Sequence, residues 1–122
     1  MVSSSTLPNG FIESLESIVG TDHVRTDELS RDAYGVDALN RGRRADVVVF
    51  PSRTTEVADI ARACDQALVP LTARGAGTGY TGGAVPVAGG VVLSLERMNK
   101  IIEIDTASLL AIVEPNVVTA DL

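Results

Sequence analysis

A glycine-rich block with almost no charge constrains this chain more than any other part of its sequence. Seven of the eleven glycines lie between Gly75 and Gly90, and Arg74 is the one charged residue between Asp65 and Glu96. Prolines and an apolar run frame the block closely, which predicts a shaped loop rather than a low-complexity linker. Because glycines alternate at its start, successive backbone N–H groups can turn toward one ligand with no side chain in the way.

The same block has the chemistry of a diphosphate site. Converging backbone N–H groups bind anions, and the lack of Asp and Glu around the block removes the charge repulsion that would oppose phosphate. Thr78 and Thr81 can add hydroxyl donors. The sequence therefore predicts a neutral, glycine-rich cradle for a diphosphate.

Two familiar phosphate motifs fit this block poorly. A P-loop needs a lysine beside Ser or Thr at the end of the glycine run, but the single lysine of the chain is Lys100. Gly77-x-Gly79-x-x-Gly82 matches the fingerprint of nicotinamide-dependent reductases, yet Pro86 and more glycines follow, so no helix can begin there. A third interpretation stays open, in which the glycines only make tight turns between strands.

Hydrophobic periodicity predicts an N-terminal helix and a wrapping segment over residues 1–44. Apolar residues recur at helical spacing from residue 9 to 19, with Asn9 as the expected cap and Gly20 closing the helix in the left-handed conformation. The polar residues after it are expected to wrap around the fold, with a turn or two of helix near Tyr34.

Residues 45–122 predict a βαβ unit with a right-handed crossover, followed by strands that meander. The fold class is therefore α+β with a mixed sheet. Asn116 is expected to make a left-handed turn after the last strand, and Thr119 to start a helix. The expected elements are a strand at 46–50, a helix reaching residue 68 with Ser52 or Thr54 as its cap, strands at 69–73 and 91–95, and a hairpin of 101–105 with 109–114.

Length and charge exclude several classes of protein. A chain of 122 residues builds one core. Ten basic and sixteen acidic residues give a net charge of −6, which disfavours nucleic acids and anionic membranes as partners. With one cysteine, Cys64, and one histidine, His23, neither a disulfide scaffold nor a zinc finger can form. We expect a soluble, cytoplasmic protein with no membrane span, an inert buried Cys64 and a solvated His23.

A resemblance to a known family is carried by the run P-L-T-A-R-G-A-G-T-G-Y-T-G-G at residues 70–83. Residues 84–86, 90–98, 104–105 and 113–115 extend it. Together they resemble the FAD-binding domain of the FAD-linked oxidase family typified by vanillyl-alcohol oxidase and p-cresol methylhydroxylase. The chain is most similar to the branch of glycolate oxidase flavoprotein subunits, D-lactate dehydrogenases and D-2-hydroxyglutarate dehydrogenases.

The resemblance implies that the loop wraps the pyrophosphate of FAD. It also implies noncovalent attachment, because Thr78 stands where family members that bind FAD covalently through this loop have a histidine. It assigns no catalytic residue and no metal ligand to this chain. The cofactor-binding residues that it implies are Arg74, Gly75, Ala76, Gly77, Thr78, Gly79, Gly82 and Gly83, with Pro51 near the same cavity.

The function implied is that of the FAD-binding portion of a dehydrogenase or oxidase of small 2-hydroxy acids such as glycolate or D-lactate. In that class of enzyme the substrate α-carbon gives a hydride to the flavin. Family members continue with a second segment over the flavin and a substrate domain, so we expect Leu122 to be a truncation point and the chain alone to be inactive. The alternative is a non-catalytic interaction domain with the same fold, completed by a second copy or a partner subunit.

Overall fold

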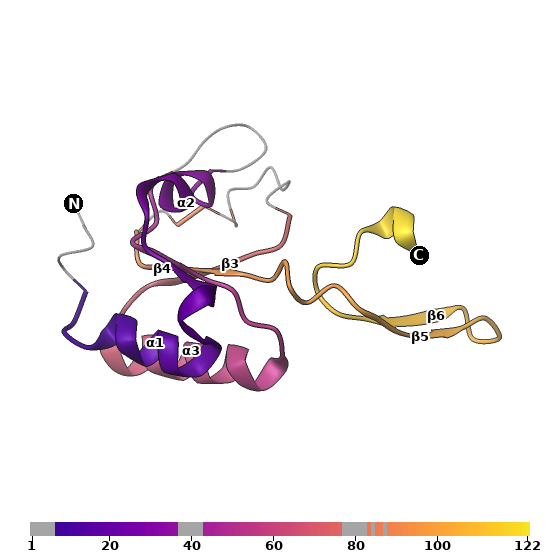
Figure 1. Ribbon diagram of the computed structural model, residues 1–122. Coiled ribbons are helices and arrows are strands. Elements are labelled where there is room, and N and C mark those ends of the chain that lie inside the picture. Colours follow the sequence, from indigo (N-terminus) through magenta and orange to yellow (C-terminus); the bar gives the residue numbers. More distant parts are fainter. Residues whose placement is uncertain (1–6, 37–42, 77–82, 84, 87) are drawn as a thin grey trace.

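A mixed four-stranded sheet forms the centre of the computed structural model, and a separate two-stranded hairpin extends from one side of it (Figure 1). The structure describes residues 7–36, 43–76, 83, 85–86 and 88–122. The order of the sheet is β1 (Val24–Arg25), β2 (Val47–Val49), β4 (Val91–Ser94) and β3 (Leu71–Arg74), and the hairpin consists of β5 (Ile101–Asp105) and β6 (Leu110–Val113).

The mixed sheet and the α+β class expected from the sequence are confirmed. β2 and β3 both run parallel to β4, which lies between them, and β1 is antiparallel to β2. Helix α3 (Thr54–Ala67) therefore connects two strands that are not neighbours. The strand that follows the glycine-rich block fills the gap between them.

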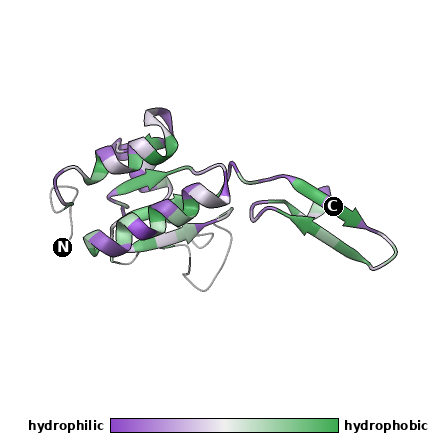
Figure 2. Cartoon of the chain, turned by 90° about the horizontal axis from the view of Figure 1, so that it is seen from below, coloured by the Kyte–Doolittle hydropathy of each residue, from purple (hydrophilic) through white to green (hydrophobic). Residues whose placement is uncertain are grey.

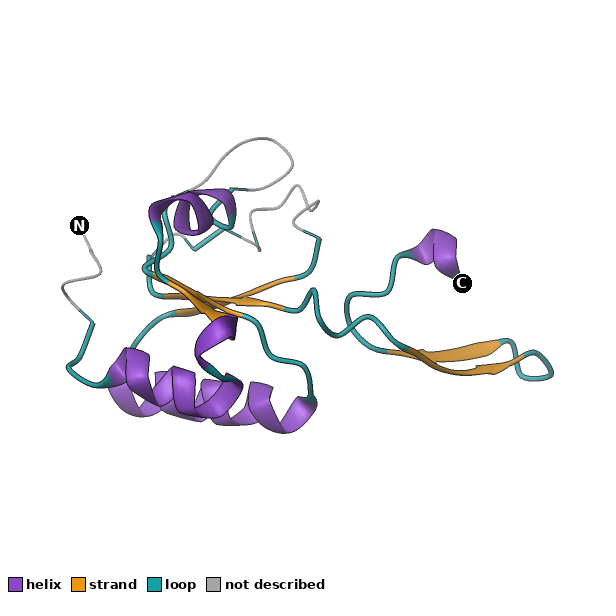
Figure 3. Cartoon of the chain, in the orientation of Figure 1, coloured by secondary structure: helices purple, strands orange, loops and turns teal. Residues whose placement is uncertain are grey.

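The two faces of the sheet are covered by different helices. α1 (Phe11–Val19) and α3 lie on one face, and the short α2 (Glu28–Ala33) lies on the other (Figures 1 and 3). Alternate residues of β2 point to opposite faces, so a strand buried on both sides reads as an uninterrupted apolar run. The α1/α3 core contains Phe11, Leu15, Val19, Val24, Val47, Val49, Ile60, Cys64, Val91 and Leu93, and the opposite core contains Ala45, Val48, Phe50 and Val92.

The helix starts differ from the sequence-based expectation. α1 has Gly10 at its N-cap with φ 79°, and the N–H of Phe11 bonds the carbonyl of Pro8, so Asn9 is not the cap. Gly20 closes α1 with φ 92° and ψ 150°, which lies outside the left-handed helical region. Neither Ser52 nor Thr54 caps α3. Instead the Glu56 carboxylate reaches back and accepts hydrogen bonds from Ser52 N and Oγ at 2.7 and 3.0 Å.

The C-terminal hairpin forms where the sequence predicts it. Asp105 Oδ1 accepts hydrogen bonds from the backbone N–H groups of Ala107 and Ser108 at 3.1 Å, which shapes its turn. Asn116 lies in a turn but not in the left-handed conformation expected, since Leu68 and Leu109 are the described non-glycine residues with positive φ. The expected helix start is a short 3-10 turn over Thr119–Asp121.

Hydrophobic residues line both strands of the hairpin (Figure 2). Among the described residues, every helix is too short or too polar to span a lipid bilayer.

Candidate cofactor-binding site

The carboxyl ends of the three parallel strands meet at one edge of the sheet, and the glycine-rich block begins there. Arg74, the last residue of β3, is in register with Ser94 of β4, and Leu95 N donates to Arg74 O at 2.8 Å. Pro51 follows the end of β2 at the same edge. Crevices at the carboxyl ends of parallel strands are the usual place for ligands in such sheets.

Gly75 and Ala76 are exposed and line a cavity of about 420 Å³. Its other wall is the segment after β6, residues 115–120. A Cβ on Gly75 would come within 3.3 Å of Asn116 Oδ1, so the two walls approach closely at this point. None of the described residues that line the cavity is charged. No sequence pattern indicates that residues 115–120 face the glycine-rich block, because only the fold brings them there.

The Arg74 side chain is directed at the segment after α2. Its Nη1 donates to the carbonyl oxygen of Val36 and, at 3.4 Å, to that of Tyr34. The guanidinium also lies over the Tyr34 ring, 5.6 Å from the centroid. Arg74 therefore joins the start of the glycine-rich block to residues 34–36.

Tyr34 lies at the centre of a polar and aromatic cluster. Its hydroxyl donates to Glu96 Oε1 at 2.5 Å, and its ring meets Phe50 edge to face, with 5.3 Å between centroids. Burial, followed by the bond to the Glu96 carboxylate, raises the pKa of Tyr34 to about 12. Arg97 Nη1 donates to the Phe50 carbonyl at 2.6 Å. The sequence places Tyr34 in a wrapping segment and does not link it to the glycine-rich block.

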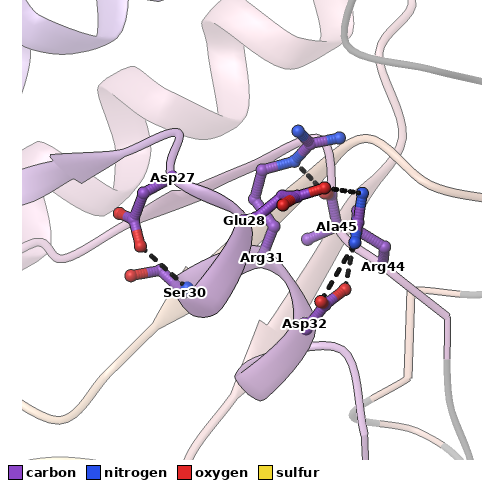
Figure 4. Close-up of polar contacts among 7 residues, drawn as sticks. All are labelled: Asp27, Glu28, Ser30, Arg31, Asp32, Arg44 and Ala45. Carbon is purple, nitrogen blue, oxygen red and sulfur yellow. Dashed lines mark hydrogen bonds and ion pairs between the residues drawn. The ribbon is translucent and has the colours of Figure 1, made fainter.

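Polar contacts hold α2, and with it Tyr34, against the approach to β2 (Figure 4). Arg31 Nε donates to the Ala45 carbonyl at 2.8 Å. Arg44 bonds both carboxylate oxygens of Asp32, at 2.6 and 3.0 Å, and reaches Glu28 at 3.1 Å. Arg44 is therefore paired with two acidic side chains of α2.

The other residues predicted to bind the cofactor differ in how buried they are and in whether the structure describes them. The Pro51 side chain is fully buried, so it shapes the sheet edge without forming its surface. Gly83 is exposed. Four predicted residues lie outside the described residues: Gly77, Thr78, Gly79 and Gly82.

His23 and Cys64 show no catalytic arrangement. His23 is half-buried in a short 3-10 helix and lines a small cavity of about 170 Å³ with Phe50 and Arg97, rather than an open loop. Cys64 is 2% exposed, and burial raises the pKa of its thiol to about 11, so it is protonated at neutral pH. Within the described part of the chain, no three His, Cys, Asp or Glu side chains gather where a metal could bind.

Comparison with known proteins identifies the family. A family model described as an FAD binding domain matches residues 45–122. The chain therefore belongs to the FAD-binding domain family, which confirms the family and the cofactor, FAD, expected from the sequence.

The relatives are FAD-linked enzymes several times longer than this chain. This chain is 38% identical over 107 residues to an uncharacterized FAD-linked oxidoreductase of Mycobacterium tuberculosis. The aligned residues cover 86% of this chain and 23% of the relative. It is 36% identical over 111 residues to the glycolate oxidase subunit GlcD of Bacillus subtilis, covering 90% and 24%. A D-lactate dehydrogenase of Anaerostipes hadrus is 34% identical over 112 residues, covering 91% and 24%. The chain thus spans about a quarter of these relatives.

Solved structures agree on the fold. The crystal structure of p-cresol methylhydroxylase with bound substrate superimposes with a TM-score of 0.78 and 27% identity, over 96% of this chain and 24% of that one. The fold of the p-cresol methylhydroxylase type, which the resemblance implied, is therefore confirmed.

Proposed function

We propose that this chain is the FAD-binding part of an FAD-dependent oxidoreductase of small 2-hydroxy acids. The observation that carries the proposal is the place of the glycine-rich block. It leaves β3 at the carboxyl edge of the sheet, beside a cavity of about 420 Å³ whose described lining residues are all uncharged. A cavity whose described lining is uncharged, with Gly75 at its wall, fits the diphosphate of FAD because no carboxylate among those residues opposes it.

In this proposal the loop over residues 75–83 holds the FAD diphosphate through backbone groups. Gly75 and Ala76 are the described residues whose exposure and position support that role, with Gly83 at the far end of the loop. Gly77, Thr78, Gly79 and Gly82 belong to the same proposed cradle by sequence, and Pro51 shapes its edge. Attachment is noncovalent, because the loop contains no histidine.

The substrate class is proposed from the relatives. Glycolate oxidase and D-lactate dehydrogenase both take small 2-hydroxy acids by name, and this chain is 36% and 34% identical to them. Bound FAD would accept a hydride from the substrate α-carbon. No described residue is assigned to the substrate. We also propose a cytoplasmic location, which the lone cysteine supports.

Titration of the purified chain with FAD, followed by flavin fluorescence, tests the proposal. Wild type should bind, and Ala76→Asp should weaken binding at least tenfold, because it places a carboxylate at the cavity wall facing the diphosphate. Ala61→Asp adds the same charge on the exposed face of α3 and is the matched control, with binding unchanged. A wild-type chain without measurable FAD binding, or equal binding by Ala76→Asp, would refute the assignment.

Activity is tested separately. The chain loaded with FAD should not reduce an electron-accepting dye with glycolate or D-lactate, because it spans only about a quarter of the enzymes that it resembles. Turnover by the 122-residue chain would contradict the proposed division between cofactor and substrate groups.

A further inference from the structure

The guanidinium of Arg74 makes its hydrogen bonds and its ring contact with other residues of the chain. It donates to the carbonyls of Tyr34 and Val36 and lies over the Tyr34 ring. These acceptors are half-buried, so an Arg74 that turned away to bind a ligand would leave them without this donor. An arginine that donates to two backbone carbonyls and lies over an aromatic ring therefore holds its direction more firmly than a solvent-exposed one.

Tyr34, in turn, is fixed from three sides. Its hydroxyl is bound by Glu96, which follows β4 and also accepts from Ser94 Oγ at 3.2 Å. Its ring packs on Phe50, which follows β2. Through Arg74 it reaches the end of β3. The Tyr34 side chain thus connects the carboxyl ends of all three parallel strands at the point where the glycine-rich block departs.

We propose that Arg74 is a positioning residue for the FAD site and not a ligand of the diphosphate. By contacting the Tyr34 ring and donating to the carbonyl of Val36, Arg74 sets the direction in which the chain leaves β3. Gly75 and Ala76 then face the cavity. The proposal rests on the proposed function. It predicts that Tyr34, which is not expected to contact phosphate, affects FAD binding through the same route as Arg74.

Four single variants and one double variant separate positioning from direct binding. Arg74→Lys keeps the charge but replaces the planar guanidinium over the Tyr34 ring with a compact ammonium group, and Tyr34→Ala removes the ring. Each should weaken FAD binding by about tenfold. The double variant should bind at most about twofold more weakly than either single variant, because both substitutions remove the contact between the Arg74 guanidinium and the Tyr34 ring. Tyr34→Phe keeps the ring under Arg74 and should bind FAD like wild type. Arg62→Lys, at an exposed ion pair on α3, is the matched control.

Ionic strength provides a second readout. If Arg74 contacted the diphosphate, Arg74→Lys would retain most of the affinity, and Arg74→Ala would flatten the salt dependence of FAD binding. A positioning role predicts instead that Arg74→Ala binds about tenfold more weakly with the salt dependence of wild type. Additive losses in the double variant, or a flattened salt dependence in Arg74→Ala, would overturn the proposal.

A third readout does not depend on FAD. Hydrogen exchange at the amides of Gly75 and Ala76 in the flavin-free chain should be faster in Arg74→Lys and Tyr34→Ala than in wild type, and unchanged in Arg62→Lys. Melting temperatures verify that each variant is folded. Unchanged exchange refutes the positioning role alone, whereas a wild-type chain that does not bind FAD refutes the proposed function.

Discussion

Asp46 and Gly90 are joined by a reciprocal pair of hydrogen bonds. Gly90 N donates to the Asp46 carboxylate at 2.8 Å, and Asp46 N donates to the Gly90 carbonyl at 2.9 Å. Asp46 is 2% exposed, so its carboxylate is partnered in the interior. This pair fixes the end of the glycine-rich block to the start of β2, while Arg74 fixes its beginning.

Gly90→Ala should destabilise the chain strongly. Gly90 has φ 78°, and a Cβ there would lie 2.3 Å from the Pro70 carbonyl oxygen, so the backbone must move. We expect a loss of about 2–4 kcal/mol in the free energy of unfolding, measured by urea titration. Gly10→Ala, at φ 79° but with open space around the Cβ, is the control and should cost about 1 kcal/mol. Equal losses in both variants would show that the Pro70 contact is unimportant.

Leu68→Gly should stabilise the chain. Leu68 ends α3 with φ 55° in the left-handed conformation, and its side chain is 89% exposed. Glycine adopts that conformation without the steric cost of a Cβ, so we expect a gain of about 0.5–1 kcal/mol in the free energy of unfolding. Gln66→Gly, inside the same helix, should lose about 1 kcal/mol instead. A lower melting temperature for Leu68→Gly would contradict the prediction.

Alkaline pH should remove a contribution of Cys64 to stability. The pKa of its buried thiol is raised from the ordinary 9.0 to about 11, so the folded chain holds this proton more tightly than the unfolded chain. The contribution is complete below pH 9 and is lost as the pH rises to about 11. The stability difference between wild type and Cys64→Ala should therefore shrink over that interval in urea titrations. A difference that stays constant from pH 8 to 11 would rule this out.

FAD should be released by denaturation. The glycine-rich block contains no histidine, and the single histidine of the chain is half-buried beside Phe50. Acid precipitation of the chain saturated with FAD should leave a colourless pellet and free flavin in the supernatant. A pellet that stays yellow would show a covalent bond and would overturn noncovalent attachment.

The hairpin should make the chain associate at high concentration. Ile102, Ile104, Leu110 and Ile112 are each more than half exposed, and β6 carries no charge, whereas β5 carries Glu103 and Asp105. An uncharged, apolar edge strand is a template for pairing with another copy. Ile112→Lys should lower the average mass in sedimentation velocity. Gln66→Lys, which makes the same charge change on α3, should not, and equal effects of the two would point to net charge instead.

The sequence determined the local elements and the chemistry of the block. The β-branched run 46–50 and the periodic helix after it carry their own signals, because burial on two faces or one face imposes a period on the residues themselves. The hairpin followed from turn formers between apolar runs. The helix caps were harder to predict, since Asn9 and Gly10 are both good caps and only the path of the chain selected Gly10.

Only the tertiary structure decided the order of the strands and the partners of the block. β4 lies between β2 and β3 because the chain returns there after the glycine-rich block, and no local pattern records that return. Arg74 meets Tyr34 across 40 residues, and Gly75 meets Asn116 across 41. Contacts between residues so distant in sequence depend on how packed layers bring strand ends together, so the sequence can predict a cradle for a diphosphate but not the residues that hold it in place.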